Sequence, residues 1–158
     1  MTITVLAIGK LKDKSLQALQ DEYCKRLRAF CTPEVIEVKD EANAHTDRES
    51  ECTLIKDREA QRALEKIRPG DFVILLDLHG SEWTSEEFAR RLDAWTQRSA
   101  HLVFVIAGSL GPGRALTARA DVRWKLSDLT FTHLMTRVLM LEQIYRGFMI
   151  NAGREYHK

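Results

Sequence analysis

The last part of the sequence carries several side chains that could transfer protons or bind anions. His133, Arg137 and Arg146 follow one another along a segment with helical periodicity, and Tyr156 and His157 stand just before the final residue. An imidazole titrates near neutral pH and can accept a proton, whereas a guanidinium binds phosphate or developing negative charge. The same residues could also form ordinary ion pairs on a solvated helix and a frayed chain end, so their spacing alone assigns no reaction.

A glycine-rich run, Gly108-Ser-Leu-Gly-Pro-Gly113, is the second candidate region. It does not follow the G-x-G-x-x-G pattern of dinucleotide-binding folds. Its first and last glycines have the spacing of a phosphate-binding P-loop, but Arg114-Ala115 replaces the Lys and Ser/Thr that such a loop needs, which disfavours NTP hydrolysis. Glycines let a ligand approach the backbone closely, although a tight turn between a strand and a helix explains them equally well.

The composition excludes several other kinds of site and location. The three cysteines are an odd number without a CxxC pair, so we expect reduced thiols and no metal site. The sequence opens directly into a strand-like run, and no apolar stretch is long enough to span a bilayer, so a cytoplasmic protein is expected. The net charge is only +1, with basic ends and an acidic middle, so an RNA-facing surface could be built from the termini.

Strand-like and helix-like segments alternate along the whole chain. The predicted strands are Thr2–Ile8, Glu34–Lys39, Asp71–Leu78, His101–Ala107 and Val122–Leu126, and the predicted helices span residues 13–30, 48–67, 84–98, 114–120 and 133–151. The third and fourth strands are almost entirely apolar, which is typical of strands buried on both faces of a parallel sheet. We therefore predict one α/β domain over residues 1–158, with a mostly parallel sheet flanked by helices.

In such a sheet, ligands bind beyond the carboxyl ends of the strands. Three predicted loops lie there: Leu76–Gly80, Ala107–Gly113 and Ser127–Thr132. The last helix also has an apolar stripe that is unusually rich, formed by Leu134, Val138, Leu141, Ile144 and Phe148. This stripe indicates burial against a partner such as a second copy of the chain, or alternatively a deep core within one chain.

The segments of this sequence, taken in order, resemble one protein family. They are ITVLAIGKLK, LLDLHG, VFVIAGSLGPG, LSDLTFTHLMTRVLMLEQIYRGF and the terminal REYHK. Together they resemble the RlmH family, SPOUT-class methyltransferases that modify a pseudouridine in 23S rRNA, and the resemblance covers essentially the whole chain. It implies a SPOUT fold with a C-terminal trefoil knot, an exception to the rule that chains are unknotted. It also implies a homodimer with the last helix in the interface.

The resemblance further implies a site for S-adenosylmethionine, bound in a bent conformation within the knot. The residues carried over by position are Leu76, Gly108, Ser127, Asp128, Leu129, Thr130, Phe131 and Thr132. These belong to the three loops that the sheet topology also selects. Backbone groups are expected to hold the adenine and methionine parts, and no metal is required because the methyl donor is already activated.

The implied reaction is methyl transfer to N3 of a pseudouridine in 23S rRNA of the 70S ribosome. Positioning should dominate such an in-line displacement, and a base should help because N3 loses its proton. For this chemistry we select His133, Arg137, Tyr156 and His157. His157 or His133 is expected to accept the proton, and Arg137 to contact phosphate or the developing negative charge.

Some positions depart from the family pattern, and other functions stay open. Ala107-Gly108 replaces the usual double glycine, and Thr132 and Glu155 stand where proline is frequent, which affects the rigidity of the last loop and the placement of the tail. One alternative function is a SPOUT methyltransferase acting on tRNA. The others are a non-catalytic ribosome-binding protein of the same fold and a Rossmann-like enzyme with a nucleotide cofactor.

Overall fold

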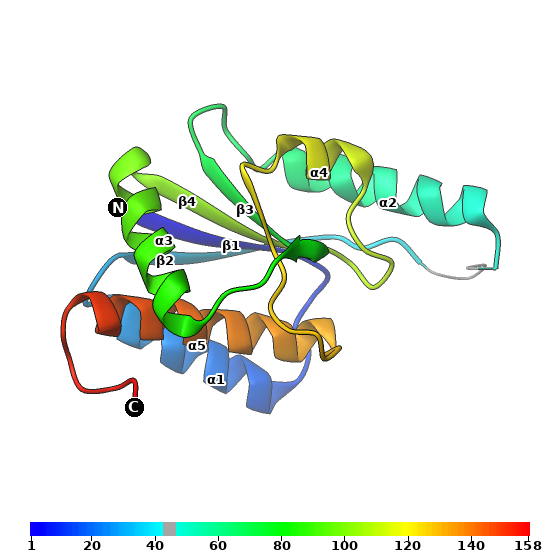
Figure 1. Ribbon diagram of the computed structural model, residues 1–158. Coiled ribbons are helices and arrows are strands. Elements are labelled where there is room, and N and C mark those ends of the chain that lie inside the picture. Colours follow the sequence, from blue (N-terminus) through cyan, green and yellow to red (C-terminus); the bar gives the residue numbers. More distant parts are fainter. Residues whose placement is uncertain (43–46) are drawn as a thin grey trace.

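The computed structural model describes residues 1–42 and 47–158 (Figure 1). Five strands form one sheet in the order β2-β1-β4-β3-β5, and every neighbouring pair is parallel. The strands are β1 (Thr2–Ile8), β2 (Thr32–Val38), β3 (Phe72–Ser81), β4 (His101–Ile106) and β5 (Val122–Trp124). The helices are α1 (Lys14–Leu27), α2 (Glu49–Leu64), α3 (Ser85–Arg98), α4 (Arg114–Arg119) and α5 (His133–Asn151). The predicted α/β class with a parallel sheet is confirmed.

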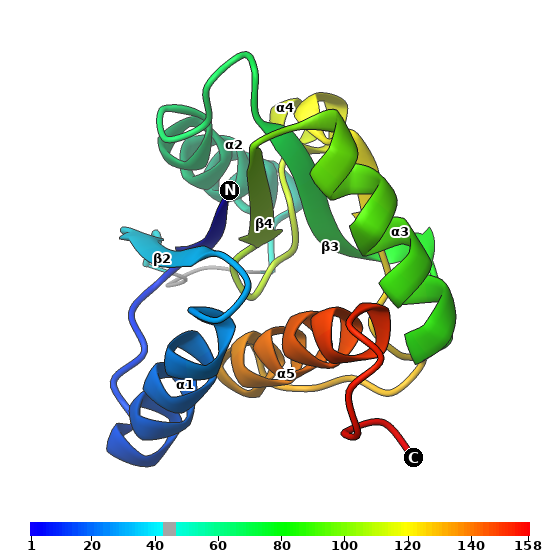
Figure 2. The same cartoon turned by 90° about the vertical axis from the view of Figure 1, so that its left-hand side faces the viewer.

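Two hydrophobic cores lie on opposite faces of the sheet. Helices α1, α3 and α5 cover one face, and α2 and α4 cover the other (Figures 1 and 2). Along β4, Leu102 and Phe104 belong to the first core, whereas Val103 and Val105 belong to the second. Both sets are buried because alternate side chains of a strand point to opposite faces, which explains the continuous apolar run in the sequence.

Local signals explain where several elements begin. Thr84 and Glu87 form the predicted capping box of α3, each accepting a hydrogen bond from the backbone amide of the other. Strand β2 begins at Thr32, two residues before the predicted start, and therefore includes Pro33. Proline is tolerated there because β2 is the edge strand of the sheet.

Helix α5 lies between α1 and α3 beneath the sheet (Figure 2). Its stripe residues Val138, Leu141 and Ile144 are buried within the chain itself, so a deep intramolecular core accounts for the apolar stripe. No helix in the described ranges is long and apolar enough to cross a membrane. Because all strands are parallel, their carboxyl ends meet at one edge, where α5 also begins (Figure 1).

Candidate functional site

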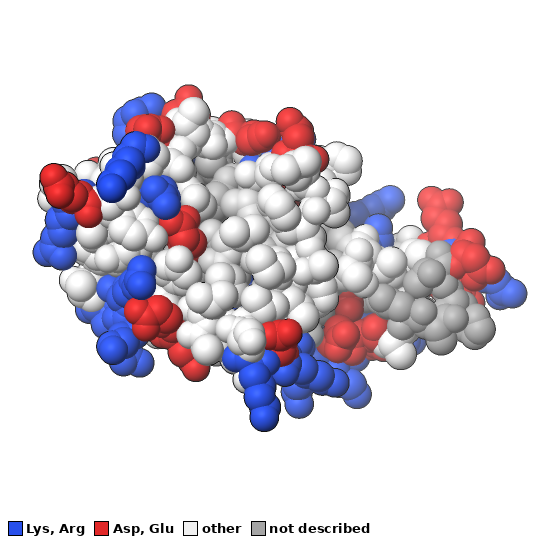
Figure 3. Space-filling view, turned by 90° about the horizontal axis from the view of Figure 1, so that it is seen from below, with Lys and Arg blue, Asp and Glu red and all other residues white. Residues whose placement is uncertain are grey.

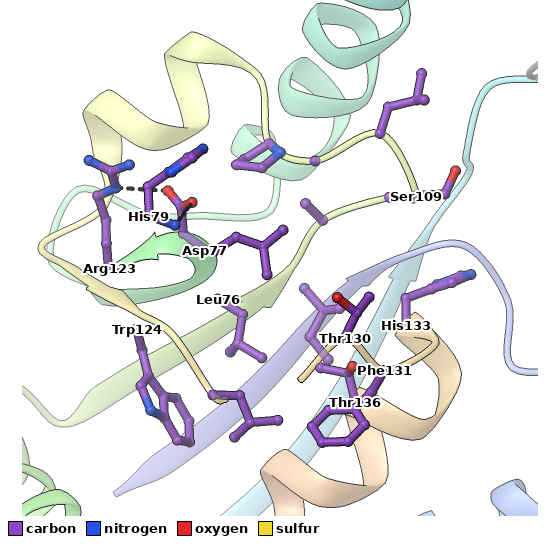
Figure 4. Close-up of a pocket in the computed structure, with 18 of the residues that line it drawn as sticks. Leu76, Asp77, His79, Ser109, Arg123, Trp124, Thr130, Phe131, His133 and Thr136 are labelled. Atoms are coloured by element: carbon purple, nitrogen blue, oxygen red, sulfur yellow. Dashed lines mark hydrogen bonds and ion pairs between the residues drawn. The ribbon is translucent and has the colours of Figure 1, made fainter. Parts of the chain in front are cut away.

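The three loops selected from the sheet topology meet in one pocket at the carboxyl edge (Figure 4). The pocket has a volume of about 620 Å³, which lies in the range of cavities that hold small organic ligands. Its wall is formed by residues of the segments 76–79, 106–112 and 123–136, together with Lys56 and Thr117. The three loops predicted from the sheet topology therefore line one continuous pocket.

The first wall is the end of β3, where an ion pair fixes the backbone. Strand β3 pairs with β4 only as far as Leu75, and beyond that point Leu76 and Ser81 pair with β5. The buried carboxylate of Asp77 accepts a hydrogen bond from the His79 amide (2.9 Å) and another from Nε of Arg123 on β5 (2.8 Å; Figure 4). Asp77 and Arg123 thus join the two strand ends and hold Leu76 at the pocket.

The glycine loop between β4 and α4 forms the second wall. Gly111 has a φ of +93°, in the left-handed region that favours glycine, and its amide donates to the Gly108 carbonyl (3.0 Å). At Gly113 a Cβ atom would lie 2.6 Å from the carbonyl oxygen of Lys56 on α2. The turn and the close approach to α2 therefore both require glycine.

Behind this loop stands a buried carboxyl group, that of Glu59 on α2. Glu59 is 3% exposed, and its Oε2 atom accepts a hydrogen bond from the Glu41 amide (3.0 Å). A Cβ atom on Gly108 would lie only 2.6 Å from Glu59 Oε1. Burial raises the pKa of Glu59, and the nearby carboxylates of Asp40 and Glu41 raise it further against the lowering effect of the Glu41 amide. Glu59 thus supports the glycine loop from outside the pocket.

The third wall is the segment between β5 and α5. Its backbone is held by side-chain hydroxyls: Ser127 accepts a hydrogen bond from the Leu129 amide (3.0 Å), and Thr132 caps α5 by accepting one from the Met135 amide (3.3 Å). The side chains of Leu129 and Phe131 are 71% and 38% exposed. A segment with apolar side chains in solvent is available to contact a ligand or a partner.

Seven of the eight predicted cofactor-binding residues line the pocket. These are Leu76, Gly108, Ser127, Leu129, Thr130, Phe131 and Thr132. The eighth, Asp128, is not part of the wall: its side chain is 82% exposed and pairs with Lys125. Although the structure brings these residues together, their role in binding a cofactor stays a prediction.

The predicted catalytic residues are separated along α5. His133 lies at the first turn and lines the pocket. Arg137 is 1% exposed and does not line it; its Nη1 atom bonds Glu37 on β2 (2.6 Å) and its Nη2 atom bonds the Gly9 carbonyl (3.3 Å). Burial alone raises the pKa of Glu37, but the bonds from Arg137 and from the Leu11 amide outweigh it and hold that pKa below its ordinary value.

Tyr156 and His157 lie near the other end of α5, in what we call the tail cluster: Glu86, Glu142, Arg146, Tyr156 and His157. The Tyr156 hydroxyl donates to Glu142 (3.1 Å), which also pairs with Arg146. One ring nitrogen of His157 contacts Arg146 (3.1 Å) and the other contacts Glu86 (2.7 Å). Burial, and then the neighbouring Glu142 carboxylate, raise the pKa of Tyr156 to about 12. This phenol therefore stays protonated at neutral pH.

The pocket and the tail cluster do not meet within one chain. His133 and Arg146 are thirteen positions apart on α5, which corresponds to about 20 Å along the helix axis at 1.5 Å per residue. One chain consequently forms the pocket with His133 and holds Arg137 in a buried network with Glu37. Arg146, Tyr156 and His157 belong to the separate tail cluster.

Sequence reasoning missed three structural carboxylates of this region: Glu37, Glu59 and Asp77. For Glu59 a signal was present, since it lies four positions after Ile55 and four before Ala63, all on the buried side of α2. The pairing of Asp77 with Arg123 has no signal in the sequence, because the register of β3 and β5 decides it.

The pocket is suited to binding and positioning a ligand. Its lining combines apolar side chains with the hydroxyls of Ser127 and Thr130 and with the imidazole of His133. Its one carboxylate, Asp77, is already engaged by Arg123. Within the described ranges, no group of three or more His, Cys, Asp or Glu residues could hold a metal ion.

Comparisons with known proteins agree with one another over the full length. Residues 1–157 match the family model described as "Predicted SPOUT methyltransferase". The protein named Ribosomal RNA large subunit methyltransferase H from Acetivibrio thermocellus is 42% identical over 159 residues. Proteins of the same name from Latilactobacillus sakei and Clostridium beijerinckii are 43% and 42% identical, and each alignment covers 100% of both chains.

Proposed function

The chain belongs to the SPOUT methyltransferase family, and from that premise we propose that it methylates ribosomal RNA of the large subunit. The proposed reaction transfers a methyl group from S-adenosylmethionine to N3 of a pseudouridine in 23S rRNA of the assembled ribosome. The rRNA substrate is supported by the full-length similarity to proteins named large-subunit rRNA methyltransferases. The observation that carries the proposal is the convergence of three separate loops on one pocket of about 620 Å³.

The residues of the pocket fit S-adenosylmethionine. Leu76, Leu126 and Phe131 offer apolar surface to an adenine ring, while the backbone of the glycine loop offers polar groups to the methionine part. Glycine at position 108 lets the loop pass close to the Glu59 carboxyl group behind it, so that the loop backbone can form part of the pocket wall. The absence of an unpaired carboxylate from the described wall agrees with recognition through backbone groups.

The donor supplies an electrophilic methyl group on a sulfonium, which the pseudouridine N3 attacks as S-adenosylhomocysteine leaves. N3 must lose its proton in this step. Of the two histidines among the described lining residues, His79 and His133, we propose His133 as the acceptor. His157 is the second candidate base, whereas Tyr156 is limited to donating a hydrogen bond because its pKa is raised to about 12. Arg137 is proposed to act by holding the start of α5 in place through Glu37 and Gly9.

A trefoil knot in the C-terminal part is included in the proposal. Strand β5 lies at the far edge of the sheet next to β3, while α4 before it and α5 after it lie on opposite faces (Figure 1). The segment 125–132 must therefore cross the carboxyl edge between the two faces. This path is compatible with a chain end threaded through a preceding loop.

We also propose a homodimer formed through the face below α5. Figure 3 shows a broad surface without charged side chains in the middle of this face, with Lys, Arg, Asp and Glu around it. Leu129, Phe131 and Met135 are 71%, 38% and 41% exposed near the start of α5, and a shallow groove next to Phe131 is lined by Leu139 and Gln143. Exposed apolar surface of this kind is typical of subunit interfaces.

A two-fold dimer would bring the tail cluster of one copy towards the pocket of the other. If two α5 helices contact each other across a two-fold axis perpendicular to them, they run antiparallel and the start of one helix lies beside the end of the other. Mixing His133→Ala with His157→Ala chains tests this arrangement. Each variant alone should have depressed methyl transfer, and mixed dimers should recover part of it because one of their two composite sites is intact. If mixed dimers recover none, His133 and His157 do not combine across the interface.

The experiment that tests the function is methyl transfer from labelled S-adenosylmethionine to 70S ribosomes, free 50S subunits and bulk tRNA. The ribosomes should come from cells that lack this gene, so that the target is unmodified. Label in 23S rRNA as N3-methylpseudouridine, with 70S preferred, is the expected result. Label only in tRNA would overturn the substrate. No label together with no cofactor binding would favour a non-catalytic protein.

A further inference from the structure

Three lysines, two on the connection between β1 and α1 and one at the first position of α1, are not explained by the methyl-transfer site. Lys10, Lys12 and Lys14 are all exposed. None of them has an ion-pair partner among the described residues. Many other cations of this chain are neutralised locally, as Arg26 is by Glu22 and Arg146 by Glu142. The connection therefore presents positive charge that the protein itself leaves available.

The backbone that carries these lysines is firmly held. Leu11, between Lys10 and Lys12, is 4% exposed, and its amide donates to Glu37 (2.9 Å). Arg137 bonds the same carboxylate and also the Gly9 carbonyl (3.3 Å). The buried network of Arg137, Glu37 and Leu11 thus fixes the connection to the start of α5, while the lysine side chains remain in solvent.

This connection lies next to the pocket. A Cβ atom placed on Gly9 would lie 3.7 Å from Cε1 of His133, which lines the pocket. Figure 1 shows the connection between β1 and α1 at the same edge of the sheet as the beginning of α5. Cations on this connection are therefore positioned beside the mouth of the ligand site.

Nearby carboxylates cancel only part of this charge. Glu37 is engaged by Arg137, and Asp13 accepts a hydrogen bond from the Leu16 amide as the N-cap of α1. Asp40 lies near Gly9. Three lysines thus stand against two carboxylates, Asp13 and Asp40, which leaves an excess of positive charge.

We propose that Lys10, Lys12 and Lys14 form a phosphate-binding strip that holds the sugar-phosphate backbone of the RNA substrate beside the pocket. Lysine ammonium groups bind phosphates as point charges without reading sequence, which suits a group that positions a strand while the pocket selects the base. This proposal rests on the proposed function, which identifies the RNA as rRNA. The local excess of positive charge would let a chain with a net charge of only +1 bind the RNA backbone.

The test compares two triple variants that remove the same charge. One replaces the strip (K10Q/K12Q/K14Q), and the matched control replaces three exposed, unpaired cations elsewhere (K25Q/K66Q/R90Q). Binding of a fluorescein-labelled single-stranded oligouridylate is measured over a range of salt concentrations by anisotropy. Each phosphate contact contributes about 0.7 to the slope of log affinity against log salt for single strands. The strip variant should therefore lose about 2 units of slope, and the control should lose none.

Other outcomes separate the strip from the proposed function. Affinity for S-adenosylmethionine should be unchanged in both variants, since these lysines do not line the pocket. Equal loss of slope in both variants, or loss in neither, would overturn the strip. If the strip variant binds RNA normally but fails on ribosomes, the lysines contact ribosomal protein and the proposal is wrong. If the strip binds RNA but wild-type protein methylates no rRNA, the strip stands and the proposed function fails.

Discussion

Replacing Gly108 with alanine tests how the glycine loop is supported. The new Cβ atom would lie 2.6 Å from Oε1 of Glu59 and 3.1 Å from its Cδ and Oε2 atoms. Ordinary contact begins at 3.4 Å, so the carboxyl group and the loop must separate by about 0.8 Å. Glu59 has little freedom to withdraw, because it is 3% exposed and its Oε2 atom holds the Glu41 amide.

The expected loss of stability follows from these contacts. Overpacking of a buried site costs about 1–3 kcal/mol. If the carboxyl group retreats far enough to break its hydrogen bond with the Glu41 amide, a charge-assisted bond of about 1.5–3 kcal/mol is also lost. We therefore expect the free energy of unfolding of Gly108→Ala to fall by about 2 kcal/mol, in the middle of these ranges. If the loop moves towards the pocket instead, cofactor affinity should fall about tenfold for each 1.4 kcal/mol of binding energy lost.

Urea denaturation and calorimetric titration with S-adenosylmethionine measure the two effects. The matched control is Gly70→Ala, because a Cβ atom at Gly70 has no neighbour within 4 Å. The double variant Glu59→Ala/Gly108→Ala removes the clash, so its stability loss should be smaller than the sum of the single losses by about 1 kcal/mol or more. Additive losses would refute the contact with Glu59 as the cause.

Three further predictions concern ionisable groups. Glu37→Gln should lower the free energy of unfolding at neutral pH. Because the pKa of Glu37 is lowered in the fold, this difference in stability from wild type should shrink as pH falls below 4.5. A difference that urea denaturation shows to be independent of pH would contradict this. Tyr156 should ionise near pH 12 in an ultraviolet absorbance titration, and replacing Glu142 with Gln should lower that pKa; a value near 10 in wild type would show that the tail is not packed. His157→Ala should depress methyl transfer while the affinity for S-adenosylmethionine stays nearly intact, since His157 does not line the pocket. Unchanged turnover in the transfer assay would remove His157 from the mechanism.

The elements and their class could be read from the sequence because their signals are local. The continuous apolar runs of β3 and β4 indicated strands covered on both faces, and the Thr84–Glu87 pair marked the start of α3. Once the sheet was expected to be parallel, the position of the ligand site followed, since the loops after its strands must share one edge. Those loops do line one pocket.

What the sequence could not decide depends on contacts between distant segments. Arg137 was interpreted as a group available to phosphate, but Glu37, one hundred positions earlier, meets it inside the protein and engages it. Tyr156 and His157 were grouped with His133, yet the tail folds back on Glu142, Arg146 and Glu86.

The sequence by itself thus determined the order of strands and helices, the parallel α/β class and the loops that carry the site. Periodicity and capping arise within a few residues, and they need no knowledge of the rest of the chain. Tertiary structure alone decided which charged side chain is buried, which is paired and which lines the pocket. These outcomes depend on strand register and helix packing, which join residues such as Asp77 and Arg123 across the sheet.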